Sequence, residues 1–530
     1  MPERYDAVVI GGGHNGLVSA AYLARAGLRT LVLERRDVLG GAAVTEEVFP
    51  GFRFSVASYV VSLLRPEIIR DLQLPRHGLR ILPLDGTLTP LDGDYLWRTD
   101  DHSQTVRELR RWSAPDAEAY EEYGLLMAEM ARFIKPILGI VPLDPRRPDP
   151  RDALPLGGLL RAFSGLPRRQ QTAFIQLMTM SAADFLDQWF ETDPLKATMS
   201  ASGIIGTFLG VRSAGTAYVL LHHYMGEIDG AFRAWGIPRD GTGGVSTAIA
   251  DAARSFGATI RTAAPVARIC VRDGRATGVV LESGEEIPAA AVLASTDARV
   301  TFLDLLEPGT LDRDFETEVR RFRFRGSSGK VNLALDGLPD LTCLPGPGEH
   351  LRGAISFSPG LDYMEQAYDD AKAGRFSRRP YVDMIIPTLV DPRMAPPGKH
   401  VVSCFVQYAP YHLAEGRSWD EEREAFGDAV VDTIAERAPN IRSLIVGRQV
   451  LTPLDIERTM GLTEGNIFQG ELSLEQLFFN RPVPGYARFR TPVRDLWLCG
   501  SSAHPGGGIM GASGRIAALE LLRSRGSAVA

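Results

Sequence analysis

The chain has 530 residues, of which 45% are hydrophobic and 23% are charged, a balance typical of a folded globular protein. Disorder over the whole chain is excluded, because enough apolar side chains are present to build a large core. The formal net charge is −7 at pH 7 and no basic tail occurs, which excludes a general nucleic-acid-binding protein.

The cysteines and the apolar runs limit the class of protein further. Cys270, Cys343, Cys404 and Cys499 form no Cys-x-x-Cys pair, so the sequence predicts neither a zinc site nor a disulfide framework, and we expect no bound metal. This cysteine usage favours a cytoplasmic location. Because neither a signal peptide nor a run of about 18 apolar residues occurs, we expect no transmembrane span, while peripheral contact with a membrane stays open.

The first 34 residues predict a strand, a glycine turn, a helix and a second strand. Gly11, Gly13 and Gly16 satisfy the G-x-G-x-x-G pattern between the strand at 5–10 and the helix at 17–26. In that pattern the glycines permit a tight turn, close approach of a pyrophosphate and close packing of strand and helix. The free N–H groups at the start of the helix favour phosphate binding.

An acidic residue follows at the position that a dinucleotide site requires. Glu34 ends the second strand, 23 residues beyond Gly11, where a carboxylate accepts hydrogen bonds from a ribose. We therefore predict a dinucleotide site; the alternative is a glycine set that only packs a strand against a helix. The predicted cofactor-binding residues of this unit are Gly11, Gly13, His14, Asn15, Gly16, Glu34 and Arg35.

A second glycine pair and a glycine-rich C-terminal turn favour FAD over NAD. Gly40 and Gly41 let the chain pass close to a pyrophosphate and a ribityl chain, which a simple NAD domain does not need. Residues 496–500 indicate a strand, and residues 506–511 open a helix of small residues on which a flat ring can rest. The predicted cofactor-binding residues here are Gly40, Gly41, Ala42, Gly500, Ser501, Gly508, Ile509, Met510 and Gly511.

The middle of the chain predicts a second domain inserted into the first. Residues 66–225 are mostly helical in pattern, but 136–167 contains seven prolines and is expected to be a long loop or lid. It is either an entrance for a lipophilic substrate or a plain surface loop. A hairpin is expected over 266–281, because Asp-Gly separates two alternating apolar runs.

The fold class that follows is α/β. We predict a discontinuous Rossmann-type FAD-binding domain over residues 1–65, 230–305 and 486–530. A mixed α+β substrate-binding domain is expected over residues 66–229 and 306–485, with the proline-rich loop 136–167.

These motifs together resemble a known family. The G-G-G-H-N-G turn, the stretch H-H-Y-M-G at 222–226 and C-G-S-S-A-H-P-G-G-G-I-M-G from 499 resemble FAD-dependent oxidoreductases of the phytoene desaturase and carotenoid isomerase group, which is related to the amine oxidases. Within that group the sequence is similar to the branch called pyridine nucleotide-disulphide oxidoreductase domain-containing protein 2. The resemblance covers nearly the whole chain and implies bound FAD, but it is not specific for a substrate.

The resemblance also implies roles for particular residues. Val266 would place its backbone near the adenine, and Gly500 with residues 508–511 would meet the ribityl chain and the flavin ring. Ser501 stands where many such folds have an acidic residue. Residues 241–244 do not form a second G-x-G-x-x-G, so we expect no dedicated nicotinamide domain.

Three residues are candidates for catalysis. Lys330 lies on an expected strand, where related amine oxidases hold a water near flavin N5; the alternative is a surface lysine. His504 precedes the glycine turn and either moves protons near the flavin or only structures the loop. His223 lies in an apolar helical stretch and either faces a substrate cavity or is satisfied in the core.

The predicted activity is that of an FAD-dependent oxidoreductase. We expect it to oxidise or desaturate a largely apolar organic small molecule by hydride transfer to flavin N5, with electrons passing to oxygen, a quinone or a redox partner. Two alternatives stay open: a redox-neutral, flavin-dependent polyene isomerase, and a flavoprotein whose main role is interaction or assembly. The oligomeric state is not readable from the sequence, and a homodimer is one possibility.

Overall fold

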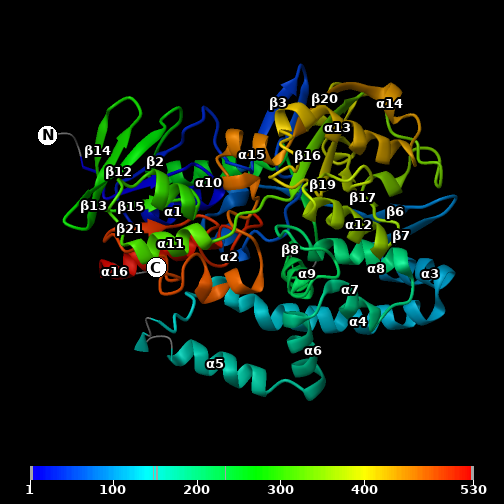
Figure 1. Ribbon diagram of the computed structural model, residues 1–530, viewed down its shortest axis with the longest axis horizontal. Coiled ribbons are helices and arrows are strands. Elements are labelled where there is room, and N and C mark those ends of the chain that lie inside the picture. The colour runs from blue at the N-terminus through cyan, green and yellow to red at the C-terminus, as the bar shows by residue number, and fades with distance from the viewer. Residues whose placement is uncertain (1–3, 147–148, 151–152, 229, 233, 527–530) are drawn as a thin grey trace.

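The fold of this chain is organised around two β-sheets of different kinds. The computed structural model describes residues 4–146, 149–150, 153–228, 230–232 and 234–526. In Figure 1 the parallel sheet near the N-terminus lies on one side of the molecule and a larger, mainly antiparallel sheet on the other. The alternation of parallel strands with helices in the first sheet gives the α/β class predicted from the sequence.

The first sheet has five parallel strands from segments far apart in the chain. Its order is β11-β2-β1-β15-β21. Every residue of β1, β2, β15 and β21 is buried, as expected for a parallel sheet covered on both faces. The strands are β1 (Ala7–Ile10), β2 (Thr30–Leu33), β11 (Thr259–Arg261), β15 (Val292–Ala294) and β21 (Leu496–Leu498).

Three helices pack together against this sheet. The first helix, α1 (His14–Arg25), contacts both α10 (Gly243–Ser255) and α16 (Ala512–Ser524). A Cβ at Gly514 would lie 2.1 Å from the carbonyl oxygen of Asn15, so the absence of a side chain there permits the close contact of α16 with α1. The N-terminal and C-terminal glycine turns are thereby placed at one edge of the sheet.

The predicted hairpin is present and extends into a small sheet. Strands β12 (Val266–Arg272), β13 (Arg275–Leu281) and β14 (Glu286–Pro288) are antiparallel. Asp273 and Gly274 between the first two have φ of 51° and 68°, the left-handed pair that a two-residue hairpin turn requires.

The second sheet has seven strands and two different faces. All neighbours are antiparallel except β17 and β6. On β16, Val331 and Leu333 belong to the core that packs against α13 (Trp419–Ala435), so Lys330 and Asn332 point to the opposite face. In sheet order the strands are β20 (Ile445–Leu451), β16 (Ser328–Leu335), β19 (His400–Gln407), β18 (Tyr381–Ile385), β17 (Ala354–Phe357), β6 (Gly86–Pro90) and β7 (Tyr95–Thr99).

A layer of helices lies along one side of the second sheet (Figure 1). Tyr123 packs against Phe185, Trp189, Phe190 and Tyr224 at the centre of this layer. The helices are α3 (His102–Trp112), α4 (Ala114–Ile134), α6 (Arg168–Thr179), α7 (Ala182–Asp187), α8 (Asp193–Ser200) and α9 (Thr216–Tyr224).

The expectation of a loop over the whole of 136–167 is wrong. Residues Ala153–Ser164 form the helix α5, which extends away from the rest of the layer in Figure 1. Its single proline, Pro155, falls in the first turn, where the missing N–H costs no helical hydrogen bond, and the rest of the helix is free of proline.

Further elements complete the fold around the two sheets. The remaining helices and strands are β3 (Thr45–Phe49), β4 (Phe52–Ser55), α2 (Pro66–Asp71), β5 (Ile81–Pro83), β8 (Glu227–Ile228), β9 (Ala231–Phe232), β10 (Gly236–Pro238), α11 (Arg313–Arg321), α12 (Leu361–Lys372), α14 (Ile441–Leu444) and α15 (Pro453–Met460). No helix of the described residues is both long and apolar enough to cross a bilayer.

The division into two domains stays a proposal, and its boundary near residue 66 needs adjustment. Ile68, Leu72 and Leu74 belong to the same hydrophobic core as the parallel sheet, although the sequence assigned them to the second domain. Phe315 and Phe322 belong to that core as well. We propose that these two segments are part of the first domain.

Candidate active site

The first cavity lies at the carboxyl ends of the parallel strands and has a volume of about 280 Å³. This edge is where open α/β sheets bind their ligands. The cavity brings together most of the residues predicted to bind the cofactor. Those that line it are Gly11, Gly13, His14, Asn15, Glu34, Arg35, Gly40, Gly41, Ala42, Val266 and Ser501.

The glycines of the first turn have different functions. A Cβ at Gly13 would meet no atom of the described residues within 4 Å, and Gly13 lines the cavity, so the space beside it belongs to the cavity. A Cβ at Gly16 would lie 2.2 Å from the carbonyl oxygen of Gly11, and Gly16 does not line the cavity. Gly16 therefore serves strand–helix packing, as the pattern predicts for its third glycine.

Glu34 is held in place by backbone donors. Its carboxylate accepts from the N–H of Gly12 at 2.7 Å and from the N–H of Arg36 at 2.9 Å, and the residue is buried. Each carboxylate oxygen keeps a further lone pair for a ribose hydroxyl. Arg35 turns away from Glu34 and donates to the carbonyl oxygens of Arg458 and Thr459.

Two buried polar atoms of the first turn have no partner among the described residues. They are Nε2 of His14 and Oδ1 of Asn15. Burial lowers the pKa of His14 to about 4, so its ring is neutral. Buried polar groups without partners are rare in proteins, so these two atoms fit a bound ligand that supplies hydrogen-bonding groups.

The C-terminal turn is fixed by two residues that the sequence did not reveal. Gln469 accepts from the N–H of Ser501 at 2.5 Å and donates to the carbonyl oxygen of Ser295 at 3.1 Å. Arg481 is fully buried and donates to the carbonyl oxygens of Ser501 and Phe468, each at 2.8 Å. Burial lowers the pKa of Arg481 to about 9. No sequence pattern marks these two residues, because each is an isolated polar residue in a loop.

The predicted residues of this turn divide between cavity and core. Gly508 and Ile509 line a second cavity, whereas Met510 is buried in the helical core. Gly511 has φ of 71° at the start of α16, and a Cβ there would lie 2.8 Å from Ile68. Gly500 lies so close to Ser295 that a Cβ would be 2.5 Å from its carbonyl oxygen. Met510, Gly500 and Gly511 therefore shape the turn, and neither of the two cavities is lined by them.

The second cavity adjoins the first and is mainly apolar. Its volume is about 120 Å³. His14, Ala42 and Ser501 line both cavities, as do Leu462 and Ile467. The apolar side chains that line the second cavity include Val60, Leu63, Ile205, Phe405 and Phe468. An apolar molecule in this space would lie directly beside the occupant of the first cavity.

Lys330 lines the second cavity and is buried, so the surface alternative is wrong. Its Nζ donates to Oδ1 of Asn332 at 2.7 Å, to Oγ of Ser403 at 2.5 Å and to the carbonyl oxygen of Ser55 at 3.2 Å. Burial lowers the pKa of Lys330 to about 7. Three acceptors match the three protons of the charged amine, which keeps the charged form accessible near neutral pH.

His223 also lines the second cavity. It lies on α9, with Nδ1 at 2.9 Å from the carbonyl oxygen of Val219, and its ring is stacked against Trp235. Burial lowers the pKa of His223 to about 4, so the ring is neutral near pH 7.

His504 is placed away from both cavities. Its Nε2 lies 2.8 Å from the carbonyl oxygen of Ile137, and burial lowers its pKa to about 4. This contact joins the C-terminal turn to the start of the proline-rich segment. It favours the loop-structuring alternative for His504 over a role in proton transfer.

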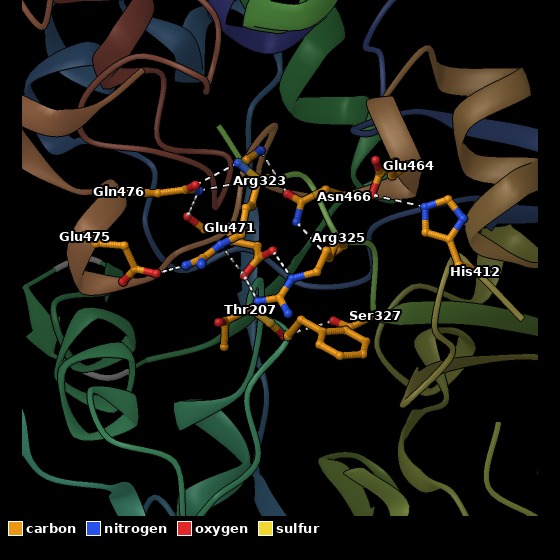
Figure 2. A network of polar contacts seen from close by, with 12 residues as sticks. Thr207, Arg323, Arg325, Ser327, His412, Glu464, Asn466, Glu471, Glu475 and Gln476 are labelled. Carbon is orange, nitrogen blue, oxygen red and sulfur yellow. Dashed lines mark hydrogen bonds and ion pairs between the residues drawn. The ribbon is translucent and has the colours of Figure 1, made fainter. Parts of the chain in front are cut away.

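A polar network holds the loop that borders both cavities (Figure 2). Arg325 donates to the two carboxylate oxygens of Glu471 at 2.6 and 2.8 Å, and Glu471 is fully buried. Gln476 accepts from the N–H of Arg323 at 2.7 Å and donates to its carbonyl oxygen at 3.1 Å. Asn466 donates to the carbonyl oxygen of Arg325 at 3.3 Å. The segment before β16 thus fixes the loop that carries Ile467, Phe468 and Gln469 into the cavities.

Comparison with known proteins agrees with this geometry. Residues 16–426, more than half of the chain, match the family described as flavin containing amine oxidoreductase. The chain belongs to this family. Together with the cavity of the first sheet, this makes the protein an FAD-dependent oxidoreductase, as predicted.

Named relatives of this flavin-containing amine oxidoreductase cover nearly the whole chain. The chain is 42% identical to pyridine nucleotide-disulfide oxidoreductase domain-containing protein 2 of Rattus norvegicus, over 98% of this chain and 93% of the relative. It is 27% identical to one of the subunits of limonene dehydrogenase from Castellaniella defragrans, over 99% and 95%. It is 25% identical to the lycopene-forming phytoene desaturase of Paracoccus sp., over 97% and 96%. The predicted resemblance to this group is confirmed.

A solved structure has the same fold. An oxidoreductase from Methanosarcina mazei superposes with a TM-score of 0.63 at 18% identity, over 98% of this chain and 99% of that chain. All four cysteines of this chain are free.

Proposed function

We propose that this enzyme oxidises or desaturates a largely apolar organic molecule held in the second cavity. The observation that carries the proposal is the apolar second cavity, which shares lining residues with the cofactor cavity. Two relatives carry names of enzymes that act on hydrocarbons, limonene dehydrogenase and phytoene desaturase. Apolar walls bind such molecules by removing their surface from water.

Residues of the first cavity would bind the cofactor, whereas Lys330 would act on the substrate side. The glycine turn and Glu34 would hold the pyrophosphate and ribose of FAD, with His14 and Asn15 supplying further polar contacts. Bound FAD would supply a hydride acceptor, its N5 atom, for a C–H bond of the substrate, with oxygen, a quinone or a redox partner as the final electron acceptor. Lys330, on the second cavity, would hold or move a proton at Nζ, which its lowered pKa permits near pH 7.

The test is reduction of the purified holoenzyme by candidate substrates without air. We would mix it with limonene, an acyclic polyene or octylamine, follow the loss of flavin absorbance, and compare the masses of substrate and product. Bleaching with a product two hydrogens lighter is the expected result. A product of unchanged mass that forms only with pre-reduced enzyme would overturn it in favour of the isomerase.

A variant connects the reaction to the second cavity. Ile205 lines this cavity, so Ile205→Trp is expected to fill it and abolish bleaching while FAD stays bound. The matched control is Ile175→Trp, since Ile175 is 56% exposed on α6. Equal bleaching by both variants would contradict the proposed substrate site.

A further inference from the structure

One face of the seven-stranded sheet carries a row of side chains that runs across the strands, from the second cavity away from the cofactor cavity. Lys330 on β16 is paired with Phe405 on β19, Phe405 with Asp383 on β18, and Asp383 with Ser356 on β17. Residues directly opposite each other on neighbouring strands point to the same face. Neighbouring strands are about 4.8 Å apart, so Asp383 lies about 10 Å along the sheet from Lys330.

This row lies along two adjoining cavities. Lys330 and Phe405 line the second cavity, whereas Asp383 and Ser356 line a third cavity of about 440 Å³. The second and third cavities share Tyr59, Val60, Ile205 and Trp235 as lining residues. Tyr59, which is stacked on Phe405 and donates to Asp383, lies between the two cavities. An elongated molecule that passes beside its ring would have one end on the cofactor side and the other beside Asp383.

The third cavity differs from the second in its chemistry. Hydroxyl groups line it, including those of Thr198, Ser356 and Tyr381. Behind them a buried chain of hydroxyls joins Ser356 to Ser358 at 2.9 Å and Ser358 to Thr198 at 3.1 Å. Such a wall suits a polar end of a ligand, while the second cavity suits an apolar body.

Asp383 has no ion-pair partner in the described part of the chain. Its carboxylate accepts a hydrogen bond from Oη of Tyr59 at 2.8 Å, and Tyr59 is stacked on Phe405. Burial raises the pKa of Asp383 to about 6, so most of the carboxylate is charged at pH 7. Lone charges are costly to hold away from water, and a cation that binds beside them relieves that cost.

Aromatic side chains line the third cavity together with Asp383. Among them are Tyr59, Tyr381 and Trp235. The faces of aromatic rings attract cations, and a ring of them beside a carboxylate favours an ammonium group over a neutral hydroxyl.

We propose that the substrate is amphipathic and that Asp383, with Tyr59 and the aromatic walls, binds its cationic nitrogen. The nitrogen is held about two strand spacings away from the row position of Lys330, so the bond that reacts is a C–H bond of the apolar body and not one on the carbon that carries the nitrogen. This inference rests on the proposed function, which supplies the apolar body of the substrate. It adds that the polar end of the substrate is a cationic nitrogen.

The test compares two ligands of equal length on the purified holoenzyme. Octylamine and 1-octanol would be titrated and their dissociation constants measured by calorimetry and by perturbation of the flavin spectrum. Octylamine is expected to bind at least about tenfold more tightly than octanol, and Asp383→Asn is expected to reduce that ratio to about one. The matched control is Asp314→Asn, because Asp314 is exposed on α11 and lines neither of the two cavities, so its variant is expected to keep the ratio.

A second measurement needs no variant. For the unmodified enzyme, the preference for octylamine over octanol is expected to fall as the pH is lowered through about 6, because Asp383 becomes protonated while the amine stays charged. The groups that face Asp383 are Tyr59, Tyr381, Ser356 and Phe405, and none of these titrates near pH 6. Among the other residues that line the third cavity, Arg98, Asp100 and His102 are charged or titratable. Equal binding of amine and alcohol at pH 7, with FAD bound, would overturn the inference and leave the proposed function standing. Absence of bound FAD would overturn the proposed function itself.

Discussion

The side-chain amide of Asn15 donates a hydrogen bond to the hydroxyl of Ser501 at 3.0 Å, across 486 residues of sequence. The contact joins the N-terminal glycine turn to the C-terminal one at a point where both border the first cavity. Many related folds have an acidic residue at the position of Ser501. In this chain the hydroxyl instead fixes the amide, whose Oδ1 stays free of protein partners in the described residues and faces a ligand-binding region.

Ser501→Ala is expected to weaken FAD binding about tenfold. The change leaves Nδ2 of Asn15 buried without its acceptor, a loss of about 1–3 kcal/mol. FAD affinity measured by fluorescence on the apoprotein would check this, with Ser255→Ala as control, because Ser255 donates only to Ala252 at the end of α10. Unchanged affinity in Ser501→Ala would show that the Asn15 contact is dispensable.

The two glycines of the first turn are expected to respond differently to alanine. Gly16→Ala forces a Cβ within 2.2 Å of a backbone oxygen and should lower the free energy of unfolding of the apoprotein by about 1–3 kcal/mol. Gly13→Ala should change that free energy by less than about 1 kcal/mol, because its Cβ meets open space. Since this space is the cavity, Gly13→Ala should nevertheless weaken FAD binding. Unfolding of the apoprotein and FAD titration together separate the two effects; a strongly destabilised Gly13→Ala would contradict the assignment.

The local patterns explain why the sequence predicted the cofactor cavity well. Gly11, Gly13 and Glu34 lie within one βαβ unit, so their spacing alone determines how strand, turn and helix bring them together. The C-terminal turn was found for the same reason, because Gly508 follows a buried strand and precedes a helix.

The substrate side could not be predicted in the same way. Lys330, Phe405 and Asp383 are brought into one row only by the pairing of three strands, and strand register over such separations is not encoded in any local spacing. Arg481 donates to backbone carbonyls of loops, which leave no pattern in the sequence. The number of prolines in 136–167 did not predict α5, because a proline in the first turn of a helix, such as Pro155, is compatible with that helix.

Arg325→Ala is expected to destabilise the protein by about 2 kcal/mol and to weaken FAD binding. Glu471 is fully buried, and its two hydrogen bonds to Arg325 would be lost, although exposure of the Arg325 side chain at 42% limits the effect. The loop that carries Gln469 should become less rigid, which weakens the hydrogen bond between Gln469 and the N–H of Ser501. Thermal unfolding and FAD titration would be measured, with Arg321→Ala as control, because Arg321 forms an exposed ion pair within α11. Equal behaviour of the two variants would contradict a positioning role for Arg325.

Lys330 is expected to make stability depend on pH. Burial lowers its pKa from 10.5 to about 7, so between these values the unfolded chain holds a proton that the folded chain lacks. The free energy of unfolding should therefore rise with pH across this window, by up to about 1.4 kcal/mol per pH unit. Denaturant unfolding at pH 7, 8 and 9 would show a smaller slope for Lys330→Met than for the unmodified enzyme and for Lys372→Met, since Lys372 is exposed on α12. Identical slopes in all three would mean that Lys330 keeps its charge in the folded state.

Lys330→Met is also expected to slow the return of flavin colour when the reduced enzyme meets oxygen, without loss of FAD. The amine is the titratable nitrogen that Ser55, Asn332 and Ser403 hold on the second cavity, and methionine removes its charge while keeping a similar length. Stopped-flow mixing of anaerobically reduced enzyme with oxygen at pH 6 and pH 8 would measure the rate. The difference between the two proteins should be larger at pH 6, where the amine is charged. An unchanged rate at both pH values would exclude Lys330 from the reaction with oxygen and leave the amine a purely structural link between β16, β19 and the end of β4.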